Sequence, residues 1–175
     1  MGAFGGRRAH QVLWAHAVIL VTVGTQLPFD RLVGAMDALA PSLGVPIFAQ
    51  IGHGGLAPRN MDWAPMLSGE EFLRRFAGAT TVVAHAGIGT VLMAQRWRKP
   101  IVLVPRRSGR GEHRNDHQLA TCAELRGRRG IYVADGIDDL AVLLKQTLLP
   151  AGDDAELDQR LGLVEGLRRQ LHRWS

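Results

Sequence analysis

The sequence predicts an α/β domain in which a Rossmann-like parallel sheet carries helices on both faces. Short runs rich in β-branched residues alternate with segments whose apolar residues recur at helical spacing. The runs at 80–84 and 101–104 carry no charged residue, which is typical of parallel strands covered on both faces. Gly87 and Gly89 follow the first of these runs and precede a helix, so they predict an anion-binding turn at the carboxyl edge of the sheet.

Composition limits the chain to one domain and to a few classes of ligand. With 175 residues, of which 46% are apolar, the chain is long enough for a single well-packed core. Its 21 basic and 16 acidic residues give a formal charge of +5, which suits an anionic ligand, an anionic membrane face or nucleic acid. The basic clusters lack interleaved aromatic residues and a known nucleic-acid motif, so no nucleic-acid partner is expected. The single cysteine, Cys122, cannot form an internal disulfide and fits a reducing cytoplasm.

Three regions are expected along the chain: an N-terminal extension at 1–16, a nucleotide-binding domain at 17–150, and a basic amphipathic helix within 151–175. Two arginines before the apolar segment 12–23 mimic a signal peptide, but His16 interrupts the segment and no small-residue cleavage site follows. No apolar run reaches the roughly 18 residues that a membrane-spanning helix needs. The protein is therefore expected to be soluble on its own.

The first half of the domain is expected to contain two strands and two helices. Pro28 is tolerated in a first helical turn, and the apolar residues after it recur at helical spacing. Ser68, with Glu71 three residues later, forms a capping box at the start of a second helix. The segment 56–67 is polar and broken by prolines, so no element is expected there. The expected elements are a strand at 17–23, a helix at 28–40, a strand at 45–51 and a helix at 69–79.

The second half continues the alternation. The glycine turn leads into a helix that opens near Thr90, and Lys99 with Pro100 ends this helix before the next strand. The segment after that strand is polar, as expected of a loop that contacts a ligand at the carboxyl edge of a sheet. The expected elements are strands at 80–84, 101–104 and 131–134, and helices from about 90 to 98, at 116–126 and at 137–148.

Two loops are expected to meet at one crevice and to bind a nucleotide diphosphate. Gly24 and Thr25 end the first strand, and the turn at 85–90 ends the strand at 80–84. Glycines without a Cβ atom let backbone N–H groups approach a phosphate. Neither loop matches the G-x-G-x-x-G fingerprint, and the chain lacks the G-x-x-x-x-G-K-[ST] motif, which disfavours a nicotinamide enzyme and a nucleoside triphosphatase.

The polar segment 106–118 offers groups that could bind a sugar. Asp116 and Gln118, at the start of a helix, can hydrogen-bond sugar hydroxyls, although Asn115 or Asp116 can equally cap that helix. His85 ends a buried strand and can serve either as a ligand contact or as a structural residue bonded to backbone.

A metal site in this segment is not expected. His113 and His117, with Glu112 and Asp116, supply suitable residue types. They lack the i, i+4 histidine pair with a distant carboxylate that zinc enzymes show.

Five motifs in order give the chain a clear resemblance. They are VTVGTQLPFDRLV at 21–33, QIGHGG at 50–55, AHAGIGTVL at 84–92, KPIVLVPR at 99–106 and GEHRNDHQLA at 111–120. The chain resembles the C-terminal, donor-binding domain of family 28 glycosyltransferases of the GT-B fold, over residues 18–149. It is most similar to the small subunit of split enzymes: the dolichol-pathway N-acetylglucosaminyltransferase and, through GEHRNDHQ, bacterial exopolysaccharide glucuronosyltransferases.

The resemblance implies a role for particular residues in binding a UDP-sugar donor without metal or cofactor. The implied diphosphate contacts are Gly24, Thr25, His85, Gly87, Gly89, Thr90 and Arg106, and the implied sugar contacts are Asp116, His117 and Gln118. Many family members bind the ribose with a glutamate on the helix after the glycine turn, where this chain has Met93. Glu112 or a backbone group would have to replace that contact, and His85 and Glu112 are the candidate catalytic residues.

The resemblance also implies an activity and a setting. The chain would be the donor-binding and catalytic subunit of an inverting transferase that moves a sugar, expected to be glucuronosyl, to a lipid-linked acceptor. A membrane-anchored partner subunit would bind the acceptor and hold this chain at the inner face of the plasma membrane. The alternatives are a UDP-N-acetylglucosamine transferase subunit, a nucleotide-sugar-binding module without catalysis, and an oligomeric interaction protein.

Overall fold

The computed structural model describes residues 17–152. The extension expected at 1–16 and the helix expected within 151–175 lie outside the described residues. Within residues 17–152, no helix is both long and apolar enough to cross a membrane.

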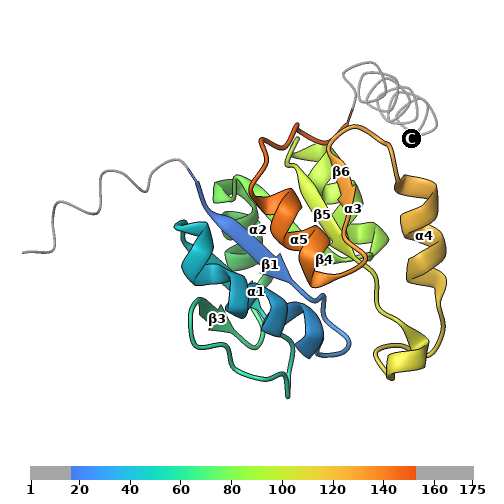
Figure 1. Ribbon diagram of the computed structural model, residues 1–175. Helices are drawn as coiled ribbons and strands as arrows, with labels where there is room; N and C mark the ends of the chain where they lie inside the picture. Colours follow the sequence, from blue (N-terminus) through green and yellow to red (C-terminus); the bar gives the residue numbers. More distant parts are fainter. Residues whose placement is uncertain (1–16, 153–175) are drawn as a thin grey trace, which may run out of the picture.

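A parallel sheet of six strands forms the centre of the molecule (Figure 1). Every pair of neighbouring strands is parallel, and the spatial order is β3-β2-β1-β4-β5-β6. The order reverses between β1 and β4, and in open parallel sheets the crevice at such a reversal is where ligands bind. The strands are β1 (Ile19–Thr22), β2 (Ile47–Gln50), β3 (Asp62–Ala64), β4 (Thr81–His85), β5 (Ile101–Val104) and β6 (Ile131–Val133).

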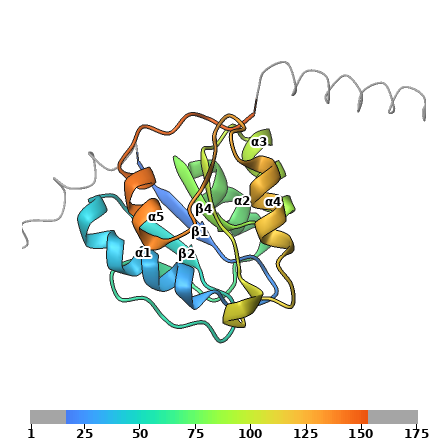
Figure 2. The same cartoon turned by 45° about the vertical axis from the view of Figure 1, so that its right-hand side comes forward.

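Helices cover both faces of this sheet, so the predicted fold class is confirmed. Side chains of α1 and α5 pack in one apolar cluster, and side chains of α2, α3 and α4 pack in a second cluster. Figures 1 and 2 show α1 and α5 on one side of the sheet and α3 and α4 on the other. The helices are α1 (Asp30–Leu43), α2 (Gly69–Gly78), α3 (Ile88–Arg96), α4 (His117–Leu125) and α5 (Ile137–Leu144), with a short 3₁₀ turn η1 (Ser108–Arg110) before α4.

The buried strands explain why their sequences show no alternation of polar and apolar residues. In β1, Ile19 and Val21 face the cluster that contains α1, whereas Leu20 faces the cluster that contains α2 and α3. All three side chains are buried. Because both faces are covered, both sets of alternate positions have to be apolar.

Strand β3 was not anticipated by the sequence pattern. It lies at the edge of the sheet, pairs only with β2 among the described strands, and leaves Trp63 42% exposed. A three-residue edge strand needs no apolar run, because its outer edge and part of its side-chain surface meet solvent. Helix α3 begins at Ile88, two residues before the expected position, with Gly87 at its N-cap.

The cap of α2 gives a test of local helix stability. The Ser68 Oγ atom accepts a hydrogen bond from the Glu71 N–H at 3.2 Å, as the capping-box pattern predicts. We expect Ser68→Ala to lower the free energy of unfolding by about 1 kcal/mol, because that N–H then loses its protein partner. Urea denaturation followed by circular dichroism measures the change.

Ser42→Ala is the matched control for this cap. The Ser42 hydroxyl is near the end of α1 and donates to the Leu39 carbonyl oxygen, which caps no N–H group. Its removal should change stability by less than the Ser68 substitution. Equal losses in the two variants would contradict the capping role.

Candidate functional site

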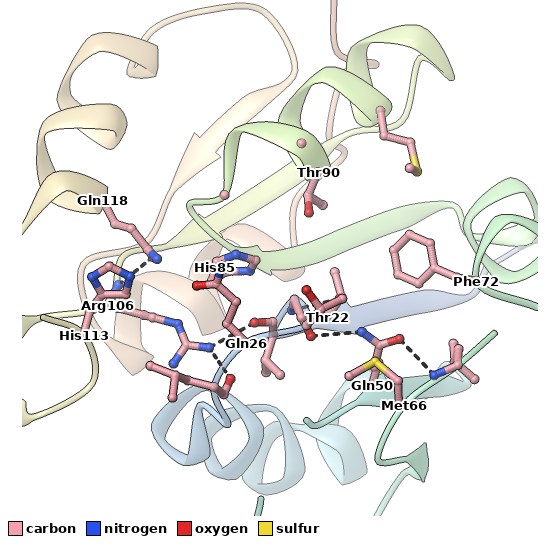
Figure 3. A pocket seen from close by; sticks show the side chains of 18 of the residues that line it. Thr22, Gln26, Gln50, Met66, Phe72, His85, Thr90, Arg106, His113 and Gln118 are labelled. Carbon is pink, nitrogen blue, oxygen red and sulfur yellow. Dashed lines mark hydrogen bonds between the residues drawn. The ribbon is translucent and has the colours of Figure 1, made fainter. Parts of the chain in front are cut away.

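A cavity of about 580 Å³ opens at the carboxyl edge of the sheet, where the strand order reverses (Figure 3). Its wall comes from the ends of β1, β2, β4 and β5 and from the first turns of α2, α3 and α4. The lining residues are Thr22, Val23, Gly24, Thr25, Gln26, Leu27, Gln50, Met66, Leu67, Gly69, Phe72, His85, Gly87, Gly89, Thr90, Met93, Arg106, His113 and Gln118.

The lining changes in character from one end of the cavity to the other. Phe72 and Met66 form an apolar wall at one end, and His113 and Gln118 lie at the opposite end (Figure 3). Thr90, in the first turn of α3, lies between these ends. The cavity therefore has an apolar end and a polar end, and the start of α3 lies between them.

His85 is held between two glycine residues. A Cβ atom on Gly24 would lie 2.6 Å from the Cε1 atom of His85, and a Cβ atom on Gly87 would collide with its Nε2 atom. Gly24 also has a φ of +80°, which L side chains rarely adopt. The glycines at 24 and 87 therefore make room for the imidazole ring, whereas a Cβ on Gly89 would meet no atom within 4 Å.

The imidazole of His85 is neutral at physiological pH. Burial of the ring lowers its pKa to about 4, and the charge of Arg106 contributes in the same direction. Among the described residues, no hydrogen-bond partner reaches its buried Nδ1 atom. At neutral pH the ring therefore brings no positive charge to the cavity that it lines.

Arg106 holds the loop after β1 from inside. Its guanidinium donates to the carbonyl oxygens of Val23, Leu27 and Pro28 at 2.9, 2.6 and 2.7 Å, and to that of Glu112 at 3.3 Å. The group lies 4.5 Å from the centroid of a phenylalanine ring, and the residue is 2% exposed. Burial lowers the pKa of Arg106 from its usual range, with the charge of Glu112 opposing that effect.

Two buried glutamines fix the other loops around the cavity. The Gln118 Oε1 atom accepts from the backbone N–H groups of Ala86 and Arg106 at 3.2 and 3.1 Å. The Gln50 side chain donates to the Gly24 carbonyl oxygen at 3.1 Å and accepts from the Leu67 N–H at 3.2 Å. Gln50 was not among the predicted site residues, although a buried polar residue ending an apolar strand is a usable signal.

Most of the predicted contacts come together in this cavity, and three do not. Gly24, Thr25, His85, Gly87, Gly89, Thr90, Arg106 and Gln118 line it. Glu112, Asp116 and His117 are not among the lining residues. Asp116 and His117 are exposed on the loop and first turn of α4, and the Asp116 carboxylate accepts from the Ser108 N–H at 2.8 Å.

The carboxylate of Glu112 is engaged by other parts of the domain. It accepts two hydrogen bonds from Arg31, at 2.6 and 2.9 Å, and one from the Arg107 N–H at 2.9 Å. Burial would raise the pKa of Glu112, but these donors outweigh burial and lower it. Glu112 is therefore ionised and joins α1 to the segment after β5.

The charge and geometry of the cavity suit an anionic ligand. Its described lining includes the arginine at position 106 and no aspartate or glutamate. Gly87 is the N-cap of α3, no side chain caps this helix, and Gly87, Gly89 and Thr90 at its start line the cavity. Within residues 17–152, no group of three or more histidine, cysteine, aspartate or glutamate side chains is placed to hold a metal ion.

Comparison with protein families identifies the domain. The model of the glycosyltransferase family 28 C-terminal domain matches residues 18–128. The chain belongs to this family. The match includes the loops after β1, β2, β4 and β5, which together build most of the cavity. A search of curated proteins found no match.

Comparison with solved structures supports the fold. The chain superimposes on the crystal structure of the glycotransferase of kitacinnamycin with a TM-score of 0.55 and 24% identity, covering 96% of this chain and 43% of that chain. The glycosyltransferase SnogD from Streptomyces nogalater gives a TM-score of 0.45 and 19% identity, with 74% and 33% of the two chains covered. The chain thus spans less than half the length of these two proteins. The domain is the Rossmann-like, C-terminal type of the GT-B glycosyltransferases, as the sequence predicted.

The packing of His85 predicts different effects for two neighbouring glycines. Gly87→Ala should lower the free energy of unfolding by roughly 1–3 kcal/mol, because its methyl group collides with the imidazole. Gly89→Ala should be neutral or stabilising by up to about 1 kcal/mol, because it adds a helix-favouring residue in open space. Chemical denaturation measures both, and similar losses in the two variants would refute the steric account.

The lowered pKa of His85 predicts a loss of stability in acid. The unfolded chain takes up a proton near pH 6.5 and the folded chain only near pH 4, so this contribution is fully present above pH 6.5 and is lost as the pH falls toward 4. At about pH 5 the loss should be on the order of 2 kcal/mol relative to neutral pH.

The control for this effect is His85→Asn, which cannot be protonated in that range. Its unfolding free energy should vary less between pH 7.5 and 5 than that of the unsubstituted protein. The same pH dependence in both proteins would show that other groups cause the acid destabilisation.

Proposed function

We propose that this chain is the donor-binding and catalytic part of an inverting, metal-independent glycosyltransferase that uses a UDP-sugar. The observation that carries the proposal is an anion-adapted cavity at the strand-order reversal of a family 28 domain. An uncapped helix N-terminus, a buried arginine and the absence of acidic residues from the described lining all favour a diphosphate there.

The two ends of the cavity suggest how the donor lies in it. The nucleoside would pack against the apolar wall of Met66, Phe72 and Met93. The diphosphate would meet the first turn of α3 near Thr90, and the sugar would extend toward Gln118. Departure of the nucleoside diphosphate leaves negative charge that N–H groups and the helix dipole stabilise.

The transferred sugar and the acceptor are proposed from the motif at 111–118. Its GEHRNDHQ sequence resembles bacterial exopolysaccharide enzymes that transfer glucuronosyl units to lipid-linked sugars. We therefore assign a glucuronosyl donor, a lipid-linked acceptor and a membrane-anchored partner subunit that binds the acceptor. This arrangement would hold the chain in the cytoplasm at the inner face of the plasma membrane.

A thermal-shift screen tests the donor assignment. UDP, UDP-glucuronate and UDP-N-acetylglucosamine at about 100 times their dissociation constants should stabilise the folded chain by about 2.7 kcal/mol. For a domain of this size, that corresponds to a rise in melting temperature of roughly 5–10 °C. When the two donors are compared at one equal concentration, a larger shift with UDP-N-acetylglucosamine than with UDP-glucuronate would favour the alternative donor. Stabilisation by ADP or GDP alone would overturn the assignment of uridine.

A matched pair of threonine variants tests whether the nucleotide binds in this cavity. Thr90→Val removes a hydroxyl from the middle of the cavity and should reduce the shift with UDP. Thr121→Val removes a hydroxyl that bonds the His117 carbonyl oxygen within α4, and it should leave the shift unchanged. Equal responses would place the nucleotide elsewhere. Binding of UDP-sugars without transfer, even with membranes present, would identify a module that binds donors without catalysis.

A further inference from the structure

Helix α3 presents an apolar face at the surface of the described domain. Ile88 and Leu92 are one helical turn apart, and they are 60% and 46% exposed within residues 17–152. Val91 and Ala94 of the same helix are buried in the core. Single exposed apolar residues are common, whereas two neighbours on one helix face indicate a surface for packing.

The described part of the chain ends beside this face. Ala151 is fully buried in the apolar cluster that contains residues of α3. A Cβ atom on Gly152 would lie between 3.5 and 3.8 Å from atoms of Gln95. Gln95 is three residues after Leu92 and seven after Ile88, so these three residues share one side of α3. The chain therefore leaves Gly152 at one end of the exposed apolar face.

The sequence after Gly152 has the pattern of an amphipathic helix. Its apolar residues recur at helical spacing, and its acidic residues precede its basic ones, which suits the helix dipole. Gly162 and Gly166 would weaken such a helix in isolation, so it needs a surface against which to pack. The apolar positions are Leu157, Leu161, Val164 and Leu171, the acidic ones include Asp153, Asp154 and Glu156, and the basic ones include Arg168, Arg169 and Arg173.

The spacing of apolar residues after Gly152 matches the spacing on α3. At about 1.5 Å per helical residue, Leu157 would lie roughly 7 Å and Leu161 roughly 13 Å beyond Gly152. On α3, Leu92 and Ile88 lie roughly 5 and 10 Å from Gln95 along the helix axis. A helix that runs back along α3 from Gly152 would therefore bring its first two leucines over the two exposed side chains.

The charges at the point of exit favour the same arrangement. Arg96 and Arg98 are exposed at the end of α3. The segment after Gly152 begins with Asp153 and Asp154. In an antiparallel arrangement these acidic residues would lie near the basic end of α3, where opposite charges attract.

We propose that Ile88 and Leu92 form the docking surface for this chain's own segment 153–164, which folds there as a helix antiparallel to α3. Docking covers both apolar side chains and supports the first turn of α3 from outside the domain. Gly89 and Thr90 of that turn line the cavity, so the docked segment stabilises one wall of the site.

Hydrogen–deuterium exchange of the full chain, followed by mass spectrometry, tests the docking. The backbone amides of 155–164 should exchange slowly. Leu92→Lys should speed their exchange by about 10-fold or more, because two half-exposed side chains together bury about as much apolar surface as one leucine. Val142→Lys is the matched control, since Val142 is 58% exposed on α5, across the sheet from α3, and its exchange pattern at 155–164 should stay unchanged.

A double-mutant cycle on melting temperature tests which segment occupies the surface. Leu92→Lys and Leu157→Lys should each lower the melting temperature of the full chain. The double variant should melt no lower than the more affected single variant, because both changes break the same contact. The effects of Leu157→Lys and Val142→Lys should instead add. Leu157→Lys leaves α3 itself unchanged, so the cycle is informative even if Leu92→Lys perturbs that helix.

The opposite results would overturn the docking. These are additive losses for Leu92→Lys and Leu157→Lys, rapid exchange throughout 155–164, or protection there that Leu92→Lys leaves unchanged. A dimer in sedimentation that Leu92→Lys converts to monomer, with rapid exchange at 155–164, would make this face a contact between two copies. Protection that appears only with vesicles of phosphatidylglycerol would make the segment a membrane contact. None of these measurements uses a nucleotide, so failure of the donor assignment would leave the docking surface standing.

Discussion

The buried guanidinium of Arg106 is the interaction on which the geometry of the site depends. It binds three carbonyl oxygens of the loop after β1 and one of the segment after β5, across the point where the strand order reverses. Loss of this group would leave those buried carbonyl oxygens without a partner, which is costly. The sequence predicted that Arg106 contacts a diphosphate directly. In the structure it also fixes the shape of the loop after β1, and its positive charge lies beside the cavity.

Burial and the charge of Arg106 together set the character of His85. Burial is the main reason that its pKa is lowered, the charge of Arg106 adds to the effect, and the neutral ring packs between Gly24 and Gly87. An anion in the cavity would be attracted to the arginine and to the start of α3 without competing with a carboxylate of the described lining. The charge of the cavity would thus be complementary to an anionic ligand before binding, and little reorganisation would be needed.

The sequence was sufficient for the fold class because each buried strand has to be apolar on both faces, and each glycine turn follows such a strand. It could not reveal β3, whose short edge position requires no apolar pattern. The sequence predicted Gly87 as a residue that lets backbone approach a phosphate. The structure shows a second reason for glycine here, because its missing Cβ makes room for His85, and only the folded chain brings these two residues into contact. From the sequence, Glu112 is expected to be a free carboxylate in a polar loop. In the structure it binds Arg31, which lies 81 positions away along the chain.

The site has one half that is fixed by hydrogen bonds and one half that is exposed. Gln50, Gln118 and Arg106 bind backbone groups from four loops, so the region expected to hold the diphosphate is rigid without a ligand. Asn115, the partner of His113, lies on an exposed part of the loop instead. A rigid region suits the diphosphate that all donors of one nucleotide share, whereas an exposed loop can differ between enzymes that transfer different sugars. Specificity for the sugar should therefore reside in 111–118, and affinity for the nucleotide in the loops that Arg106 and the two glutamines hold.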